Sequence, residues 1–360
     1  MRIAQVAPLY ESVPPRLYGG TERVVSYLTE ELVRLGHDVT LFASGDSVTS
    51  ARRQPFGQRA LRLDPSAVDG LASHMRMLAH VYRRAAEFDI IHCHTDYLGL
   101  HLAHHSKTPT VITLHGRLDI PELEPLYCDF PEVSLVSVSN TQRAYMPRAP
   151  WVATVHHGLP PELFTFQPRP GSYLLFLGRI SPEKGVDAAI RVARYTKVPL
   201  RIAAKVDRVD QAYFESTIRP LLDGPEVEYL GEVDDRRKNE LLGGALALIF
   251  PIDWPEPFGL VMIEALACGT PVIARRRGSV SEVIRHGETG LVVETEDEMV
   301  EAVARARELD RIPLRREFER RFNDQVMAEH YLEVYRRILS EKHSGGLRIL
   351  APLAAPASAS

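Results

Sequence analysis

The chain has 360 residues, 45% of them hydrophobic and 25% charged, which is enough for two ordinary domains with their own hydrophobic cores. A formal net charge of −4 and a pI of about 6.4 argue against the basic surface that nucleic-acid-binding proteins use, so we expect no nucleic acid partner. The three cysteines, Cys93, Cys128 and Cys268, are odd in number and form no Cys-x-x-Cys pair, which argues against a disulfide framework and a structural zinc site.

The first residues and the distribution of apolar residues bear on where the protein works. The sequence Met1-Arg-Ile-Ala-Gln-Val-Ala-Pro8 lacks the charged region, apolar run and cleavage site of a signal peptide. No stretch approaches the roughly 18 apolar residues that a membrane span needs. We therefore expect a cytoplasmic protein, and the composition leaves open a peripheral contact with the inner face of the membrane.

Short apolar runs alternate with amphipathic segments along the first part of the chain. Arg2–Ala7 predicts a buried strand, and Asp38–Ala43 predicts the next one. Between them, Thr21–Leu35 has apolar residues at helical spacing and ends before Gly36, which predicts a helix with a glycine cap. Further strands are expected at Ile90–His92, Thr110–Leu114 and Leu135–Val138. This order of strand, helix and strand predicts a parallel sheet with crossover helices.

The same rhythm starts again after the proline-rich stretch Pro160–Pro170. A helix is expected from about Val186 to Tyr195, and a last amphipathic helix at Val326–Leu339. The strands predicted in this part are Tyr173–Leu177, Leu200–Ala204, Glu226–Tyr229, Ala247–Phe250, Pro271–Ala274 and Gly290–Val293. Two successive doubly wound α/β units are the simplest account of the pattern.

We therefore predict two domains. The first covers residues 1–165 and takes up the last helix, about 326–342; the second covers 171–325. The remainder, 343–360, is rich in Gly, Ala, Pro and Ser, so a disordered tail is expected there.

Three loops follow predicted strands, at the edge of the sheet where open α/β folds bind ligands. Gly19-Gly20 lies between the first strand and its helix, where backbone N–H groups can approach an anion; a flexible turn is the alternative. Arg179 follows Gly178, and Lys184 precedes the next helix, so both cations are expected at the mouth of the second sheet rather than on a solvated surface.

The segment Trp254–Ala265 is the most informative. It follows a strand and enters a helix, so the N–H groups of Phe258 to Val261 are predicted to lie unpaired at a helix N-terminus, which suits an anion. Glu256 stands just before this helix and Glu264 inside it. A carboxylate can accept hydrogen bonds from two hydroxyls, as in a ribose or a sugar. The alternative is that Glu256 merely caps the helix and that Glu264 is a solvated surface residue.

Other charged and histidine-rich segments are less specific. Five histidines, His92, His94, His101, His104 and His105, are close in sequence, but no closed set of further ligands accompanies them, so a zinc site is not favoured. The run Arg275–Arg277 follows a predicted strand and is expected in a solvated loop or at a ligand.

In order and spacing, four motifs of this sequence resemble those of a known family. They are Gly19-Gly20-Thr21-Glu22, Thr113-Leu114-His115-Gly116, Gly178-Arg179-Ile-Ser-Pro-Glu-Lys184-Gly185 and Glu256-x7-Glu264. The sequence, from residue 1 to about 340, resembles the retaining nucleotide-sugar glycosyltransferases of family 4. The resemblance implies the GT-B fold: two Rossmann-like doubly wound domains facing each other across a cleft, with the C-terminal helix crossing back to the first domain.

The resemblance also implies roles for the matching residues. The implied catalytic residues are Arg179 and Lys184, which would stabilise the leaving diphosphate, His115, which would line the donor-sugar pocket near C6, and Glu256, which would hold the sugar hydroxyls. The implied donor-binding residues are Gly19, Gly20, Phe258, Gly259, Leu260, Val261, Glu264, Gly231 and Val233, with Glu264 on the ribose and Gly231 and Val233 near the base. On the acceptor side we expect Glu22, His94 and Asp96.

The implied activity is transfer of a hexose, with retention, from UDP-glucose or, as second choice, GDP-mannose to the hydroxyl of a sugar, lipid-linked or small-molecule acceptor. The chain has no Asp-x-Asp, so neither metal nor cofactor is expected. A nucleotide-sugar epimerase of the same architecture and a non-catalytic nucleotide-sugar-binding protein are the alternatives. Ala203–Asp207 replaces a turn that is often glycine-rich in the family, which leaves base recognition open, as the sequence also leaves the linkage and the oligomeric state.

Overall fold

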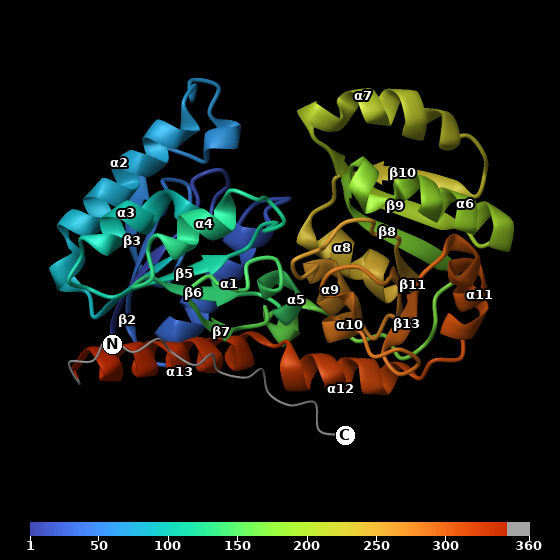
Figure 1. The fold of residues 1–360 in the computed structure, drawn as a ribbon. Helices are drawn as coiled ribbons and strands as arrows, with labels where there is room; N and C mark the ends of the chain where they lie inside the picture. Colours follow the sequence, from blue (N-terminus) through green and yellow to red (C-terminus); the bar gives the residue numbers. More distant parts are fainter. Residues whose placement is uncertain (344–360) are drawn as a thin grey trace. The chain divides into compact units, whose positions relative to one another are not determined.

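The structure is a computed structural model that describes residues 1–343. The described chain forms two compact units: unit 1 comprises Met1–Gly158 together with the segment from Asp324, and unit 2 comprises Leu159–Asn323 (Figure 1). The chain passes into unit 2 at Leu159, just before the proline-rich stretch expected to separate the domains. Of the tail predicted to be disordered, all but His343 lies outside the described residues.

Unit 1 is built on a parallel sheet of seven strands in the order β3-β2-β1-β4-β5-β6-β7. The strands are β1 (Arg2–Val6), β2 (Asp38–Ser44), β3 (Arg52–Phe56), β4 (Ile90–Cys93), β5 (Thr110–Leu114), β6 (Ser134–Ser137) and β7 (Trp151–Thr154). The helices of this unit are α1 (Gly20–Arg34), α2 (Gly70–Arg83), α3 (Leu100–His104), α4 (Leu123–Cys128), α5 (Asn140–Arg143) and α13 (Asp324–His343).

The central strands of this sheet were predictable and the edge strands were not. Every residue of β4 and of β5 is buried, because helices cover both faces, so these strands appear in the sequence as short, mainly apolar runs interrupted by His92, Thr110 and Thr113. β3 and β7 lie at the two edges. β3 has the sequence Arg-Arg-Gln-Pro-Phe with exposed positions, and a proline is tolerated there because an edge strand has one unpaired side.

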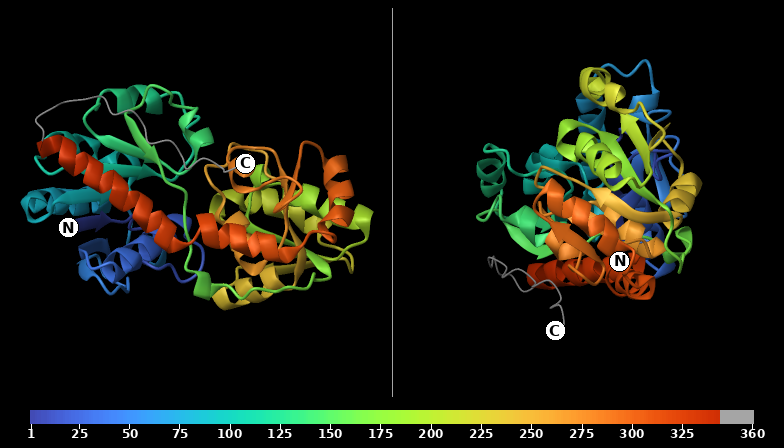
Figure 2. Two further views of the ribbon diagram at one scale, coloured as in Figure 1. Left: turned by 90° about the horizontal axis from the view of Figure 1, so that it is seen from below. Right: turned by 90° about the vertical axis from the view of Figure 1, so that its right-hand side faces the viewer.

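The last helix, α13, belongs to unit 1, where it packs against α1 (Figures 1 and 2). The apolar face that the sequence predicts is buried: Tyr331 and Tyr335 are fully enclosed, and Met327 and Val334 are exposed by at most 1%. The phenol groups of the two tyrosines reach the polar residues of β4 and β5.

Unit 2 repeats the architecture with a six-stranded parallel sheet in the order β10-β9-β8-β11-β12-β13. Its strands are β8 (Tyr173–Ile180), β9 (Leu200–Val206), β10 (Val227–Gly231), β11 (Ala245–Phe250), β12 (Val272–Arg275) and β13 (Gly290–Val293). Its helices are α6 (Val186–Thr196), α7 (Gln211–Tyr213), α8 (Asp235–Gly243), α9 (Leu260–Cys268), α10 (Val280–Val283), α11 (Glu296–Ala306) and α12 (Arg311–Arg321). All six predicted strands are present, with ends shifted by a few residues.

A buried arginine anchors α12 to this sheet. Arg311 is 3% exposed, and its guanidinium donates to the carbonyl oxygens of Ala245 at 2.5 Å and Leu246 at 3.3 Å, at the start of β11. Burial lowers the pKa of Arg311 to about 10, and the group stays charged at neutral pH. The hydrogen bonds to carbonyl oxygens compensate for the loss of hydration.

Candidate functional site

In both sheets the strand order reverses beside the first strand of the unit. β1 lies between β2 and β4, and β8 lies between β9 and β11. The loops after the two central strands therefore leave toward opposite faces, and a crevice opens at the carboxyl edge of a sheet at this point. The loop after β8 contains Lys184 and the loop after β11 contains Glu256. Strand order, which the sequence does not state, brings these two segments together.

Arg179 lies on β8 itself, which extends further than predicted, to Ile180. Its guanidinium meets three carboxylates, at 2.6 Å from Glu183, 3.6 Å from Asp207 and 3.8 Å from Asp210. Burial raises the pKa of Glu183, but hydrogen bonds from its own backbone N–H and from Ser181, together with Arg179, hold it below the ordinary value. The cation is thus fixed by acidic groups at the switch point of the sheet.

Lys184 and Glu256 form a close ion pair. The Lys184 ammonium lies 2.5 Å from Oε2 of Glu256, and both side chains are largely buried, at 15% and 12% exposure. The indole N–H of Trp254 donates to the same carboxylate oxygen at 2.9 Å, and the ammonium lies 4.9 Å from the Trp254 ring centroid. The two motifs that contain Lys184 and Glu256, 72 residues apart, therefore meet in one polar cluster.

Gly185 is what permits this approach. Its φ is +70°, and a Cβ atom there would lie 2.4 Å from the carbonyl oxygen of Pro251, closer than real Cβ atoms come to backbone. Any other residue would push the loop after β8 away from the loop after β11, and with it Lys184 from Glu256.

The helix that follows Glu256 starts as predicted. α9 begins at Leu260, so the N–H groups of Leu260 and Val261 have no acceptor within the helix. Phe258, just before it, is 2% exposed, and its carbonyl oxygen accepts from the Ser279 hydroxyl at 2.8 Å. The packing of Phe258 and this hydrogen bond fix the start of the helix and the orientation of its first N–H groups.

Glu264 is a buried residue with a partner that the sequence analysis did not single out. It is 4% exposed, and Oε1 accepts from the Lys238 ammonium at 2.5 Å; Lys238, on α8, is itself 8% exposed and also meets Asp235 at 3.1 Å. The alternative of a solvated Glu264 is therefore wrong. The signal was present in the sequence: Lys238 shares a helix face with Leu241 and Leu242, where a lysine needs a partner.

The other segments of unit 2 that the sequence singles out lie in or beside loops at the ends of strands. Arg275 and Arg277 both pair with Asp253, at 3.5 and 3.2 Å, and Arg276 pairs with Glu294, so the arginine run braces the loop after β11. Lys205, in the stretch that departs from the glycine-rich pattern, pairs with Asp207 at 3.0 Å. Gly231 ends β10, and Val233 follows it; both are half-buried.

In unit 1 the loop after β1 leads through Gly19 into α1. A Cβ atom on Gly19, whose φ is +159°, would lie 2.8 Å from Cβ of Pro15, so the turn accepts only glycine. Gly20 is the first residue of the helix, and Glu22 lies in its first turn, 5% exposed. Burial raises the pKa of the Glu22 carboxyl, against the hydrogen bond from its backbone that lowers it.

His94 directly follows β4, and His115 directly follows β5, so both lie at the carboxyl edge of the sheet. Nδ1 of His94 lies 2.9 Å from Nε2 of His115, so the two rings share a hydrogen bond. Burial lowers the pKa of His115 to about 3 and that of His94 well below its ordinary value, and both rings are neutral at physiological pH. Asp96, the third residue expected on the acceptor side, is exposed and has a φ of 49°, which few residues other than glycine adopt.

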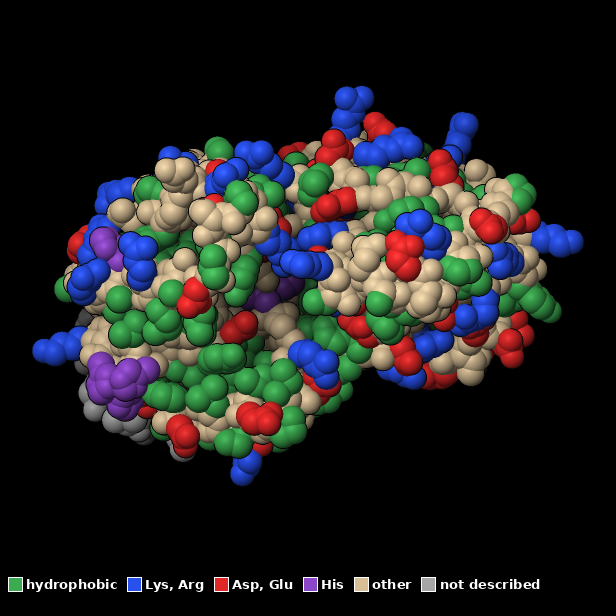
Figure 3. Space-filling view, turned by 90° about the horizontal axis from the view of Figure 1, so that it is seen from above, with side chains coloured by type: hydrophobic (Ala, Val, Ile, Leu, Met, Phe, Trp, Pro, Cys, Tyr) green, Lys and Arg blue, Asp and Glu red, His purple; other side chains and the backbone are tan. Residues whose placement is uncertain are grey.

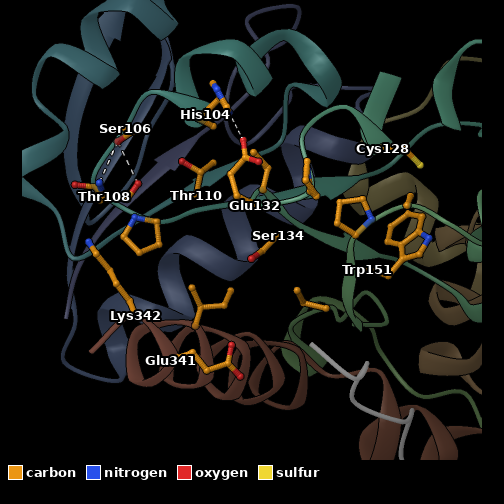
Figure 4. A pocket seen from close by; sticks show the side chains of 18 of the residues that line it. His104, Ser106, Thr108, Thr110, Cys128, Glu132, Ser134, Trp151, Glu341 and Lys342 are labelled. Atoms are coloured by element: carbon orange, nitrogen blue, oxygen red, sulfur yellow. Dashed lines mark hydrogen bonds and ion pairs between the residues drawn. The ribbon is translucent and has the colours of Figure 1, made fainter. Parts of the chain in front are cut away.

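A pocket of about 700 Å³ lies elsewhere in unit 1 (Figure 4). It is lined by the first residues of three strands, Thr110, Ser134 and Trp151, and by the end of α13, including Lys342. This is the amino edge of the sheet, opposite to the edge that carries Gly19 and His115. The pocket contains no residue that the sequence assigns to a site, and the His104–Glu132 pair closes one side of it.

Within residues 1–343 no group of three or more His, Cys, Asp or Glu side chains is arranged to hold a metal ion. On the face shown in Figure 3, acidic and basic side chains are interspersed over the surface and do not gather by sign. No described helix is long and apolar enough to span a membrane.

Comparison with known proteins defines the class of this fold and site. The family model described as Glycosyltransferase Family 4 matches residues 18–208, and the one described as Glycosyl transferases group 1 matches residues 166–324. The protein is a glycosyltransferase with the GT-B fold. It belongs to glycosyltransferase family 4.

Three relatives illustrate the range of this likeness. The phosphatidyl-myo-inositol mannosyltransferase of Mycobacterium leprae is 27% identical, over 94% of this chain and 97% of its own. The glycogen synthase of Mycobacterium tuberculosis is 27% identical, over 81% of this chain and 82% of its own. The crystal structure of AviGT4, a glycosyltransferase involved in avilamycin A biosynthesis, superimposes with a TM-score of 0.68 at 25% identity and covers 94% and 98% of the two chains.

The buried Lys238–Glu264 pair predicts a specific loss of stability. Lys238→Met leaves the Glu264 carboxylate buried without its cation, so the free energy of unfolding of unit 2 should fall by about 3–5 kcal/mol. Urea unfolding read by Trp254 fluorescence in a Trp151→Phe background reports on unit 2 alone, because the chain has two tryptophans. Arg236→Met on the same helix is the control: its side chain is 90% exposed, and the cost should stay below about 1 kcal/mol. Equal costs for the two variants would contradict the pairing.

The buried neutral histidines of unit 1 predict a dependence of stability on pH. Burial lowers the pKa values of His92, His94, His115 and His157, so below about pH 6.5 the unfolded chain takes up protons that the folded unit excludes. The free energy of unfolding of unit 1 should therefore fall on acidification from pH 7 to pH 5, by up to about 1.4 kcal/mol per histidine and pH unit.

Urea unfolding at each pH, followed by Trp151 fluorescence in a Trp254→Phe background, measures this slope. Unit 2 has a single histidine, His286, and serves as the internal control when Trp254 is followed instead. A slope no steeper in unit 1 than in unit 2 would refute the role of the buried histidines.

Proposed function

We propose that this enzyme transfers a hexose from a nucleoside-diphosphate sugar to a hydroxyl acceptor, with retention of configuration and without a metal ion or cofactor. The observation that carries the proposal is the meeting of Lys184 with Glu256, just before the N-terminus of α9, with Arg179 at the end of the neighbouring strand β8. Cations and unpaired N–H groups at one point suit a diphosphate.

The chemistry follows from where charge develops. As the bond between the sugar and the diphosphate breaks, negative charge grows on the leaving phosphate, and cations already in place lower the barrier. Arg179 is held by Glu183 and Lys184 by Glu256, so both are oriented before the donor arrives. We assign no general base: in a same-face mechanism the departing phosphate itself takes the acceptor's proton.

The carboxylates then act as grips on the donor rather than as an acid and a base. Glu256, fixed by Trp254 and Lys184, would hold the sugar hydroxyls, with the main chain of Phe258, Gly259 and Leu260 beside it. Glu264, held by Lys238, would accept the ribose hydroxyls. The backbone around Gly231 and Val233 would meet the base, and Gly19 and Gly20 would face the phosphates and sugar of the donor.

UDP-glucose is our first choice of donor and GDP-mannose the second. The names of the relatives, a mannosyltransferase and a glycogen synthase, support a hexose. The acceptor would lie near Glu22, His94 and Asp96 of unit 1 and would be a sugar, a small molecule or a lipid-linked sugar. A lipid-linked acceptor would need a peripheral contact with the inner face of the membrane.

A thermal-shift screen tests the donor. UDP- or GDP-linked hexoses should raise the melting temperature by several degrees, because a ligand at one hundred times its Kd adds about 2.7 kcal/mol to stability. Free glucose and mannose are the controls and should shift nothing. No shift with either nucleotide class would refute the proposal. Product analysis then separates the activities: an epimerised donor would identify an epimerase, and binding without release of nucleotide a non-catalytic binding protein.

The two cations should be required for turnover. Lys184→Ala and Arg179→Ala are each expected to lower kcat for release of the nucleoside diphosphate by about 10²–10³-fold, as loss of one preorganised charge does in other enzymes. Arg219→Ala is the matched control, since this arginine of unit 2 is 62% exposed and pairs with surface Glu215. Unchanged turnover in Lys184→Ala, with the fold intact by circular dichroism, would remove Lys184 from the mechanism.

A further inference from the structure

We propose that a chain of buried hydrogen bonds, running from α13 through Tyr335, Gln5 and His94, fixes a single tautomer of His115 and leaves Nδ1 of that ring as an acceptor for a substrate hydroxyl. His94, Gln5 and Tyr335 are on this view positioning residues. The inferred tautomer depends on the geometry of unit 1 alone. The inference that Nδ1 of His115 binds a substrate hydroxyl rests on the proposed function.

The chain of contacts is continuous. Nε2 of His115 meets Nδ1 of His94 at 2.9 Å, and Nε2 of His94 meets Oε1 of Gln5 at 2.9 Å. The Gln5 amide N–H donates to the Tyr335 hydroxyl at 3.3 Å. That hydroxyl also lies 2.6 Å from Nδ1 of His92. Four separate elements, β1, β4, the loop after β5 and α13, thus contribute to one network.

The network extends beyond His92 to a second tyrosine of α13. Nε2 of His92 lies 2.7 Å from the Thr113 hydroxyl, which lies 3.0 Å from the hydroxyl of Tyr331. Tyr331 therefore stands at the far end of the chain from His115, and Tyr335 in its middle. The two residues differ in distance from His115 along the network but share one helix and one chemistry.

The direction of each hydrogen bond follows from the Gln5 amide. Its nitrogen donates to Tyr335, so its oxygen must accept, and the proton between Gln5 and His94 belongs to Nε2 of His94. In a neutral ring the other nitrogen is then the acceptor, so Nδ1 of His94 accepts from Nε2–H of His115. His115 in turn carries its proton on Nε2 and keeps the lone pair on Nδ1.

Burial makes this order strict. Gln5, His92 and Tyr335 are fully enclosed and His94 is 2% exposed, so a broken link would leave a buried polar group unsatisfied. The same burial holds the pKa of His92 and of His94 well below the ordinary value and that of His115 at about 3. The rings therefore stay neutral, and each carries its single proton on one nitrogen. His157 stacks on His115 with ring centroids 5.2 Å apart and limits rotation of the ring.

Nδ1 of His115 is the end of the chain. His115 as a residue is half-buried, its Nδ1 is enclosed, and no described residue hydrogen-bonds to that atom. An unprotonated nitrogen can accept from an O–H group but has nothing to offer to an ether, a fluorine or a carboxylate. The site therefore favours a substrate that presents a hydroxyl to His115, and a deoxy, fluoro or carboxylate analogue at that position loses this contact.

The tautomer can be read without any substrate. In long-range proton–nitrogen NMR spectra of protein labelled with ¹⁵N-histidine, His115, assigned by comparison with His115→Gln, should show a protonated Nε2 and an unprotonated Nδ1. A protonated Nδ1 would mean that the Gln5 amide is turned over and the chain runs in the other direction, which would overturn the proposal.

Two matched variants test the positioning residues. Tyr335→Phe removes the hydroxyl that fixes the Gln5 amide, and His115 should then show both tautomers. Tyr331→Phe is the same substitution one turn earlier on α13, at the far end of the network, and His115 should keep one tautomer. The same spectrum in wild type and Tyr335→Phe, or equal disturbance by both variants, would overturn the role of Tyr335.

Analogues of the sugar donor test whether Nδ1 of His115 accepts a hydrogen bond from a substrate hydroxyl. With the donor that the thermal-shift screen identifies, singly deoxygenated sugars should include one that loses about tenfold in kcat/KM in the wild type, about one hydrogen bond's worth, and clearly less in Tyr335→Phe. Equal losses in both proteins would overturn the acceptor assignment even if the tautomer is as inferred. Failure of every nucleotide sugar to bind would instead refute the proposed function and leave the NMR result standing.

Discussion

The reversal of strand order beside the first strand of each sheet is the constraint on which the rest of this structure depends. Parallel strands need crossover connections, and where the connections change from one face of the sheet to the other, the loops at the carboxyl edge part and leave a crevice. In unit 2 the loops beside this point carry Lys184 and Glu256, and in unit 1 they carry Gly19 and His94. Catalytic chemistry can then vary with the loops while the two sheets stay the same.

Unit 2 keeps its charges in pairs at this edge. Lys184 with Glu256 is a largely buried ion pair and Lys238 with Glu264 a buried one, and in each pair the partners come from different elements. A single buried charge would be costly, whereas in a hydrogen-bonded pair each charge compensates and orients the other. The two carboxylates of the Glu-x7-Glu motif are therefore each held by a lysine. Stability and the orientation of the groups proposed to grip the donor depend on the same contacts.

Unit 1 uses the opposite strategy, with neutral polar groups joined in a chain. Burial keeps His92, His94 and His115 uncharged. The network therefore acts through the direction of its hydrogen bonds, which sets the tautomer of each ring, and not through charge. The chain depends on α13, because this helix supplies both tyrosines. A helix from the end of the sequence thus completes the polar interior of the first unit.

The sequence alone determined the class of fold, most of the central strands, the glycines of the tight turns and the residues of the four motifs, because burial on both faces and turn geometry leave local marks in composition and spacing. It did not reveal the edge strands β3 and β7. Each of these is short or polar and forms hydrogen bonds with only one neighbouring strand. Nor did it reveal Lys238, or the contacts of His94 with Gln5 and of Tyr335 with His92. These pairings join residues 26 to 243 positions apart, and only strand order and helix packing decide which buried polar groups meet.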